Sequence, residues 1–212
     1  MKTQFISKII GETIMRLQDA FDYRQENMFR KTPSQEYIHI AGRSRLVFPM
    51  YGAHRDFATR VSEQELRFAF VEAFNKICDE KKLNFFYSVE TPTNARTYSG
   101  FANGNPRGDN PNGRSGEFDM VIYDSHLKRV CLIEFKANNA DEKEHKKDFL
   151  KLNNMEEGDE NVLRYFIEIV RTGNAGTIKS LRNKMKPEKR GITTVVCYEL
   201  SNGGRNLTDT II

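Results

Sequence analysis

Residues 117–136 read EFDMVIYDSHLKRVCLIEFK, and this stretch decides how the rest of the chain is interpreted. Two apolar runs flank a short polar turn, a pattern typical of a β-hairpin. The acid Asp119 interrupts the first run, and Glu134 and Lys136 close the second. Charged side chains are rarely buried without a partner or a metal, so these three positions require an explanation.

The hairpin register brings the three charged residues together. If a four-residue loop joins the strands, Asp124 faces Arg129 and the same register places Asp119 opposite Glu134. Residues opposite one another project from the same face of a sheet, and the period of two sends Lys136 to that face as well. Two carboxylates can hold a divalent metal, and an ammonium beside them can orient a water molecule that is to be activated. The alternative is a partly exposed ion-pair cluster at a sheet edge.

Composition sets the class of protein. The chain has 212 residues, of which 38% are hydrophobic and 29% charged, as in a globular protein with one full core. The net charge of +4 is compatible with a polyanionic partner without requiring one. The start lacks the apolar stretch of a signal peptide, and no segment approaches the ~18 apolar residues that span a bilayer. Three widely spaced cysteines are typical of reduced core residues, so we expect a cytoplasmic protein with no membrane contact.

Apolar residues recur at helical spacing near the N-terminus, at Ile6, Ile10, Ile14, Leu17 and Phe21. This stripe predicts an amphipathic helix that docks either on the core or on a second copy of the chain, which would make a homodimer. Residues 36–50 suggest a short hairpin. We therefore assign residues 1–61 to an N-terminal helical and hairpin extension that packs on a core of residues 62–212.

The core reads as alternating strands and helices. Ser62 and Glu65 have capping-box spacing before a helical stripe that ends at Ile77. Strands are predicted over 84–91, 117–123, 130–136, 165–170 and 192–200, and helices over 138–152 and 176–186. Hairpin-linked strands followed by strand–helix alternation predict an α/β protein with a mixed β-sheet flanked by helices.

A long segment rich in Gly, Asn, Pro and Arg covers residues 93–116 and leads into the strand of Asp119. Loops of this length in compact domains are usually functional or disordered. It is either a flap that faces a substrate or a tolerated insertion.

Taken together, Asp119, Glu134, Lys136 and the element order resemble the PD-(D/E)xK nuclease superfamily, which has the restriction-endonuclease-like fold. The likeness covers roughly residues 62–200, and Phe118 stands where the motif has its proline. It implies that Asp119 and Glu134 coordinate Mg²⁺ or Mn²⁺ with the carbonyl of Phe135. It also implies that Lys136 orients the attacking water and stabilises its hydroxide form.

The family commonly adds a glutamate from the first core helix. Glu63, Glu65 and Glu72 compete for this role, and we choose Glu65 because it lies beside the apolar stripe near the start of the helix. The alternative role of Glu65 is to be the capping-box acid of Ser62.

Basic residues near the motif are candidates for contact with a phosphate backbone, namely Arg114, His145, Lys146 and Lys147. A charge run is more often a solvated helix face, and His145 is also a candidate structural residue. The leading hypothesis is a metal-dependent nuclease that hydrolyses phosphodiester bonds, foremost in DNA. The alternatives are a nuclease-fold module that binds nucleic acid or protein without cleaving, and an assembly subunit that dimerises through the N-terminal stripe.

Overall fold

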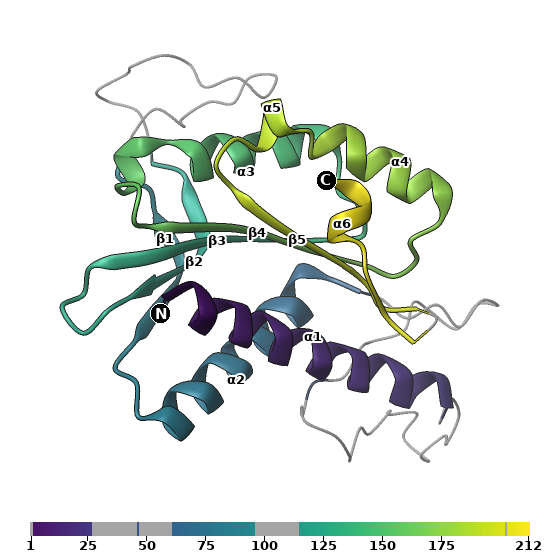
Figure 1. The fold of residues 1–212 in the computed structure, drawn as a ribbon, viewed down its shortest axis with the longest axis horizontal. Coiled ribbons are helices and arrows are strands. Elements are labelled where there is room, and N and C mark those ends of the chain that lie inside the picture. Colours follow the sequence, from purple (N-terminus) through teal and green to yellow (C-terminus); the bar gives the residue numbers. More distant parts are fainter. Residues whose placement is uncertain (1, 27–45, 47–60, 96–114, 202) are drawn as a thin grey trace.

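The computed structural model describes residues 2–26, 46, 61–95, 115–201 and 203–212 (Figure 1). Six strands form one sheet in the order β1-β2-β3-β4-β5-β6. Strand β3 pairs in parallel with β4, and β4 with β5, whereas the outer pairings are antiparallel. The strands are β1 Phe86–Pro92, β2 Glu117–Tyr123, β3 Arg129–Ala137, β4 Leu163–Val170, β5 Thr194–Glu199 and β6 Arg205–Asn206. The predicted α/β class with a mixed sheet flanked by helices is confirmed.

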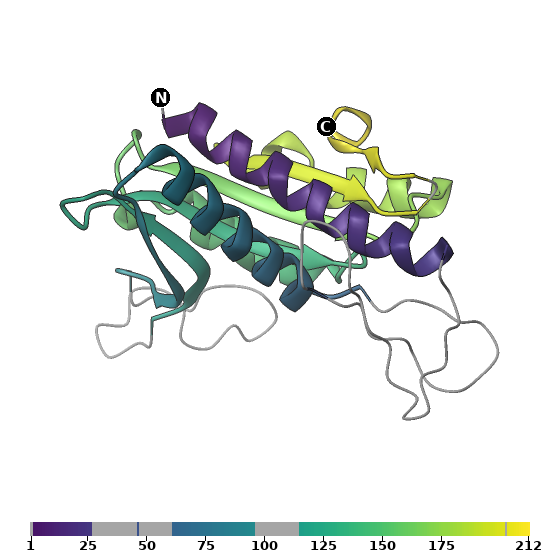
Figure 2. The same ribbon diagram turned by 90° about the horizontal axis from the view of Figure 1, so that it is seen from below.

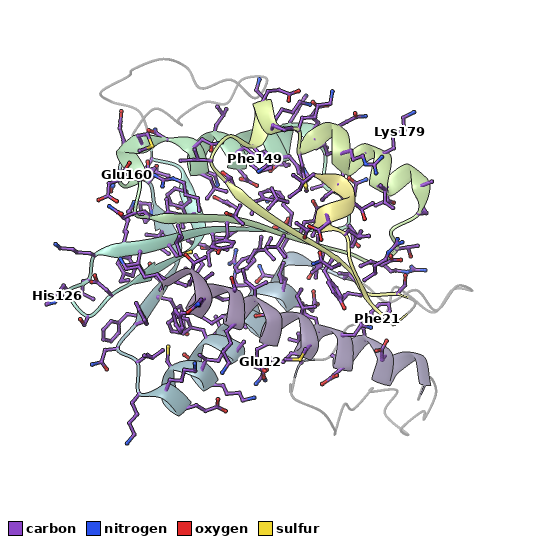
Figure 3. All side chains as sticks on the ribbon, in the orientation of Figure 1. Glu12, Phe21, His126, Phe149, Glu160 and Lys179 are labelled. Carbon is purple, nitrogen blue, oxygen red and sulfur yellow. The ribbon has the colours of Figure 1, made fainter. Side chains whose placement is uncertain are left out.

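Helices cover both faces of this sheet. Helices α1 (Lys2–Glu26) and α2 (Glu63–Lys81) lie on one face, where they run side by side (Figure 2). The opposite face carries α3 (Glu142–Asn153), α4 (Ala175–Lys184), α5 (Pro187–Arg190) and α6 (Thr208–Ile211). A short 3₁₀ turn, η2 (Met155–Glu157), follows α3. Apolar side chains fill the space on each face of the sheet, among them Phe149 of α3 (Figure 3).

The N-terminal stripe docks on the protein's own core. Each of its five residues is buried, and the stripe belongs to the same hydrophobic cluster as α2 and the α2-facing side of the sheet. Phe5 packs edge-on against Phe74 at 6.1 Å between ring centroids, and Arg16 pairs with Glu72 at 3.0 Å. The stripe is therefore not a surface for a second copy, and the homodimer expected from it loses its basis. The predicted hairpin over 36–50 lies outside the described residues apart from Leu46.

The β2–β3 hairpin has the predicted register in its body and a different turn. Met120 pairs with Ile133, and the next two pairs keep the register that sets Asp119 against Glu134. The expected Asp124–Arg129 pair is wrong, because Tyr123 pairs with Arg129 and the register shifts between Ile122 and Tyr123. The turn spans five residues, with His126 near its tip (Figure 3), and the bulge absorbs the additional residue.

Local signals account for most element boundaries. Ser62 adopts an extended conformation at the N-terminus of α2, and Lys82 ends that helix with a left-handed φ of 52°. Asp141 caps α3 by accepting a hydrogen bond from the Glu144 amide at 2.9 Å. The short elements α5, β6 and α6 have no hydrophobic period long enough to be predicted from sequence.

The cysteines and the hydropathy of the chain predict reduced core thiols and no membrane-spanning segment. Cys78, Cys131 and Cys197 are all buried and free, as expected. Across the ranges that the structure describes, no helix combines the length and apolar character needed to cross a membrane.

Candidate active site

Strands β2 and β3 stop pairing where the three charged residues lie. Their ladder ends at Met120–Ile133, although β2 continues along β1 and β3 continues along β4. Beyond that pair, Asp119 Oδ2 accepts a hydrogen bond from the backbone amide of Phe135 at 2.8 Å. A side-chain carboxylate thus takes up an amide that a regular ladder would have paired with backbone. We call this opening between the two strands the strand fork.

Glu134 and Lys136 face helix α3. They alternate along β3 with Ile133 and Phe135, which pack in the cluster beneath α1 and α2. On the α3 side, Lys136 Nζ lies 2.9 Å from Asp148 Oδ2, and Lys151 Nζ lies 2.5 Å from Glu134 Oε1. Asp148 also pairs with Lys151 at 3.0 Å, so the two strand residues and the two helix residues form a continuous chain of ion pairs.

Helix α2 reaches the same site from the other face of the sheet. Arg67 Nη2 lies 2.8 Å from Asp119 Oδ1, and Glu63 Oε1 lies 3.5 Å from Lys136 Nζ. Lys136 therefore contacts carboxylates from helices on opposite faces. The strand fork explains this arrangement, since β2 no longer closes the sheet beside the end of β3.

The resulting charge cluster combines residues of α2, β1, β2, β3 and α3, because Arg67 also pairs with Glu90 of β1 at 3.3 Å. It holds five acids and three cations, namely Glu63, Glu90, Asp119, Glu134, Asp148, Arg67, Lys136 and Lys151. Formal charges therefore leave two negative charges in excess. Six of the eight side chains are at most 19% exposed, whereas those of Glu63 and Glu90 are 39% and 66% exposed and open the cluster to solvent.

Burial and neighbouring charges set the protonation of this cluster. Burial raises the pKa of Glu134 well above its usual value, the carboxylates of Asp148 and Asp119 add to the rise, and Lys151 opposes it. Burial also raises the pKa of Glu63. For Lys136 burial acts to lower the pKa, but Asp148 and Glu63 outweigh it and raise the pKa above its usual value. Lys136 is therefore a fixed positive charge and not a proton acceptor at neutral pH.

The structure places Asp119, Glu134 and Lys136 at the strand fork, but the expected Asp119–Glu134 pair is not part of the ladder, which ends at Met120–Ile133. Asp119 instead contacts the Phe135 amide and Arg67.

The structure also favours a different acid of α2. The hydroxyl of Ser62 donates a hydrogen bond to the carboxylate of Glu65, but Ser62 makes no side-chain bond to the backbone of the helix end, so the capping box is not formed. Glu63 is the acid of α2 that lies beside Lys136. Glu72 instead pairs with Arg16 of α1 at 3.0 Å. The physical reason is the helical period, which aims positions 63 and 67 at the strand fork and position 65 elsewhere.

The residues that the sequence predicts as phosphate contacts differ in their exposure to solvent. His145 is 1% exposed, and its ring nitrogens lie 2.9 Å from the Asp141 carbonyl and 2.9 Å from Glu168. His145 is therefore a buried structural residue, as in the alternative stated above, and it has no exposed surface for a phosphate. Lys146 is exposed and Lys147 is partly exposed on α3. Arg114 lies outside the described residues.

Sequence reasoning missed Arg67, Asp148 and Lys151. The run of acids and lysines over residues 141–151 is typical of a solvated helix face. A signal for Asp148 was present, because His145, Asp148, Phe149 and Leu152 share the spacing of one buried helix face. A charged residue within such a face requires a partner, and the helix packs over the strand that carries Glu134 and Lys136.

The oxygen atoms at the strand fork can be compared with the ligands of the divalent metal that the resemblance implies. Carboxylate and carbonyl oxygens suit Mg²⁺ and Mn²⁺, and Asp119, Glu134 and the Phe135 carbonyl supply that type of ligand. The excess negative charge of the cluster also favours a cation. In the part of the chain that is described, however, no group of three or more His, Cys, Asp or Glu is arranged to hold a metal ion. Arg67 and Lys151 contact the two carboxylates, and Lys136 Nζ donates to the Phe135 carbonyl at 3.3 Å, so the donor types suit such an ion but it would have to displace these cations.

Comparisons of the chain with known protein families, with curated proteins and with solved structures gave no match.

Proposed function

We propose that this protein is a metal-dependent nuclease with a restriction-endonuclease-like core that hydrolyses phosphodiester bonds, foremost in DNA. One observation carries the proposal: Asp119, Glu134 and Lys136 lie at one strand fork, where Lys136 is held protonated by surrounding carboxylates. An ion-pair cluster at a sheet edge is the competing explanation. It does not account well for an acid of 1% exposure on a central strand whose pKa burial raises.

Each residue of the strand fork has a role in this proposal. Asp119, Glu134 and the Phe135 carbonyl would hold Mg²⁺ or Mn²⁺, and the ion would supply Lewis-acid stabilisation of the charge that grows on the phosphate. Lys136 orients the attacking water and stabilises its hydroxide form with a fixed positive charge. Glu63 replaces Glu65 as the helix acid, because it is the α2 carboxylate that lies 3.5 Å from Lys136 and its side chain is 39% exposed.

Affinity for nucleic acid is assigned to basic residues of α3 and to residues outside the described ranges. Lys146 and Lys147 are the candidates on α3, with Arg114 in the Gly- and Arg-rich segment. Such residues make contacts with the phosphate backbone that weaken as the salt concentration rises and that carry no sequence preference.

The test is a cleavage assay with the parent protein and Lys136→Ala on single-stranded, duplex and branched DNA and on RNA, first in Mg²⁺ and then in Mn²⁺. We expect the parent to cleave and Lys136→Ala to lose cleavage while it keeps Mn²⁺ binding. Lys8→Ala is the matched control, because Lys8 is exposed on α1. Circular dichroism verifies that each variant is folded, and turnover by Lys136→Ala would refute the mechanism.

A second candidate is a nuclease-fold module that binds nucleic acid without cleaving it. The ion pairs that Arg67 and Lys151 make with the two metal-ligand carboxylates favour this alternative. Metal titration separates the two candidates, because the module need not bind Mn²⁺ at Asp119 and Glu134. Nucleic-acid binding without Mn²⁺ binding or cleavage would support the module.

A further inference from the structure

Lys151 makes three close polar contacts with its ammonium group. Its Nζ lies 2.5 Å from Glu134 Oε1, 3.0 Å from Asp148 Oδ1 and 2.8 Å from the backbone carbonyl oxygen of Glu117. Of an ammonium's three N–H donors, one is used in a hydrogen bond to the Glu117 carbonyl, whereas the contact with Glu134 Oε1 is an ion pair without hydrogen-bond geometry. The ring of Phe118 covers the group at 5.9 Å from its centroid.

The surroundings keep this lysine charged. The side chain of Lys151 is 4% exposed, and burial alone would lower its pKa, but Glu134 and Asp148 outweigh burial and raise it. A buried carboxylate at 2.5 Å from a buried ammonium has its charge offset within the protein. Glu134 thus already has a cation in contact with Oε1.

A divalent ion on Glu134 would share that carboxylate with the ammonium. Two cations on one carboxylate repel each other, and the repulsion is strong where solvent is excluded. Asp148 gives Lys151 a second acceptor within the same helix, three residues away, and that contact can persist when the contact with Glu134 is broken.

We infer that Lys151 is a resident counter-ion of Glu134 that a divalent metal must displace, and that it thereby weakens and controls metal binding at the strand fork. This inference rests on the proposed function, because it assigns Glu134 as a metal ligand. It adds a residue of α3 that sets the metal affinity of the site. At low concentrations of divalent metal, Lys151 holds the site in the metal-free form.

The test is calorimetric titration of the full chain with Mn²⁺, comparing the parent protein with Lys151→Met. We expect Lys151→Met to bind Mn²⁺ about tenfold more tightly or better, a change of about 1.4 kcal/mol. Lys143→Met is the matched control, because Lys143 is an exposed lysine of the same helix, and its affinity should equal that of the parent. Adding Glu134→Gln to Lys151→Met should abolish the gain.

Loss of one buried cation can prevent folding, so a second variant is included. Lys151→Met combined with Asp148→Asn removes one cation and one acid and keeps the charge excess of the cluster unchanged. This double variant enters the same titration, with the same gain expected over the parent and over Asp148→Asn alone.

The outcomes separate the inference from the proposed function. Equal or weaker Mn²⁺ binding by the Lys151 variants, with measurable binding by the parent, overturns the inference and leaves the nuclease proposal standing. Absence of Mn²⁺ binding in every variant overturns both and points to the non-cleaving module. Tighter binding that survives Glu134→Gln also overturns the inference, because the gain would then arise at another site.

Discussion

Asp148→Asn should destabilise the protein strongly, because this buried carboxylate joins two buried ammonium groups. Asp148 lies 2.9 Å from Lys136 and 3.0 Å from Lys151, and it is 2% exposed. Removing one partner of a buried ion pair costs about 3–5 kcal/mol, because the other charge is left uncompensated. Asn keeps one carbonyl oxygen as an acceptor, and its neutrality relieves the repulsion on Glu134. We therefore expect a net loss near the lower limit, about 3 kcal/mol.

Urea unfolding followed by far-ultraviolet circular dichroism measures this loss, since the chain has no Trp to report by fluorescence. With a denaturant slope of about 3 kcal/mol per molar for a chain of this size, the midpoint should fall by about 1 M. Glu142→Gln is the matched control on the same helix. Its carboxylate lies 2.6 Å from Lys189 but is 65% exposed, so its midpoint should stay close to that of the parent. A shift for Asp148→Asn no larger than that of Glu142→Gln would refute the buried ion-pair chain.

Three further predictions concern other carboxylates. Glu157→Gln should lower the free energy of unfolding by about 2–3 kcal/mol, because this fully buried carboxylate accepts hydrogen bonds from two backbone amides and pairs with an arginine. The same urea titration measures the loss, and an unchanged midpoint would contradict the prediction. Burial raises the pKa of Glu134, so Mn²⁺ binding should be lost on acidification at a pH above the ordinary glutamate value. In Lys151→Met, which lacks the ammonium that lowers this pKa, binding should be lost at a still higher pH. Calorimetry across pH measures this, and loss only at the ordinary value would show that Glu134 is not a ligand. Glu63→Gln should slow cleavage more than Glu65→Gln when rates are compared at equal folded fraction, and the reverse order would restore Glu65 as the helix acid.

The same pKa shifts fix the sign of a stability effect. An acid whose pKa is raised in the folded state takes up a proton on folding between its unfolded and folded pKa values. The contribution of Glu134 and Glu63 to the free energy of unfolding should therefore increase as the pH falls from neutral, through their raised pKa in the folded state, to their pKa in the unfolded state of about 4.3. Replacing either acid by Gln should reduce that slope.

The hairpin shows why local periodicity can predict a register that loop counting does not. The period of two and the need to bury one face set Asp119 against Glu134, and the ladder from Met120–Ile133 onwards has that register. The turn depends on backbone conformations that no apolar pattern encodes, and Leu127 adopts a left-handed φ of 57° there. A bulge between Ile122 and Tyr123 accommodates the longer turn. The predicted register of the strand body is therefore correct, although the predicted turn is wrong.

The sequence alone determined the α/β class, the main strands and helices, and the placing of Glu134 and Lys136 on one face of the strand that follows Asp119, because each follows from spacing along one chain segment or one hairpin. Only the tertiary structure decided which residues from other elements complete the charge cluster. Glu63, Arg67, Asp148 and Lys151 reach it because α2 and α3 pack on opposite faces of the sheet beside the strand fork. A charged residue on a helix looks the same in sequence whether it faces water or a buried counter-charge, and only packing distinguishes the two.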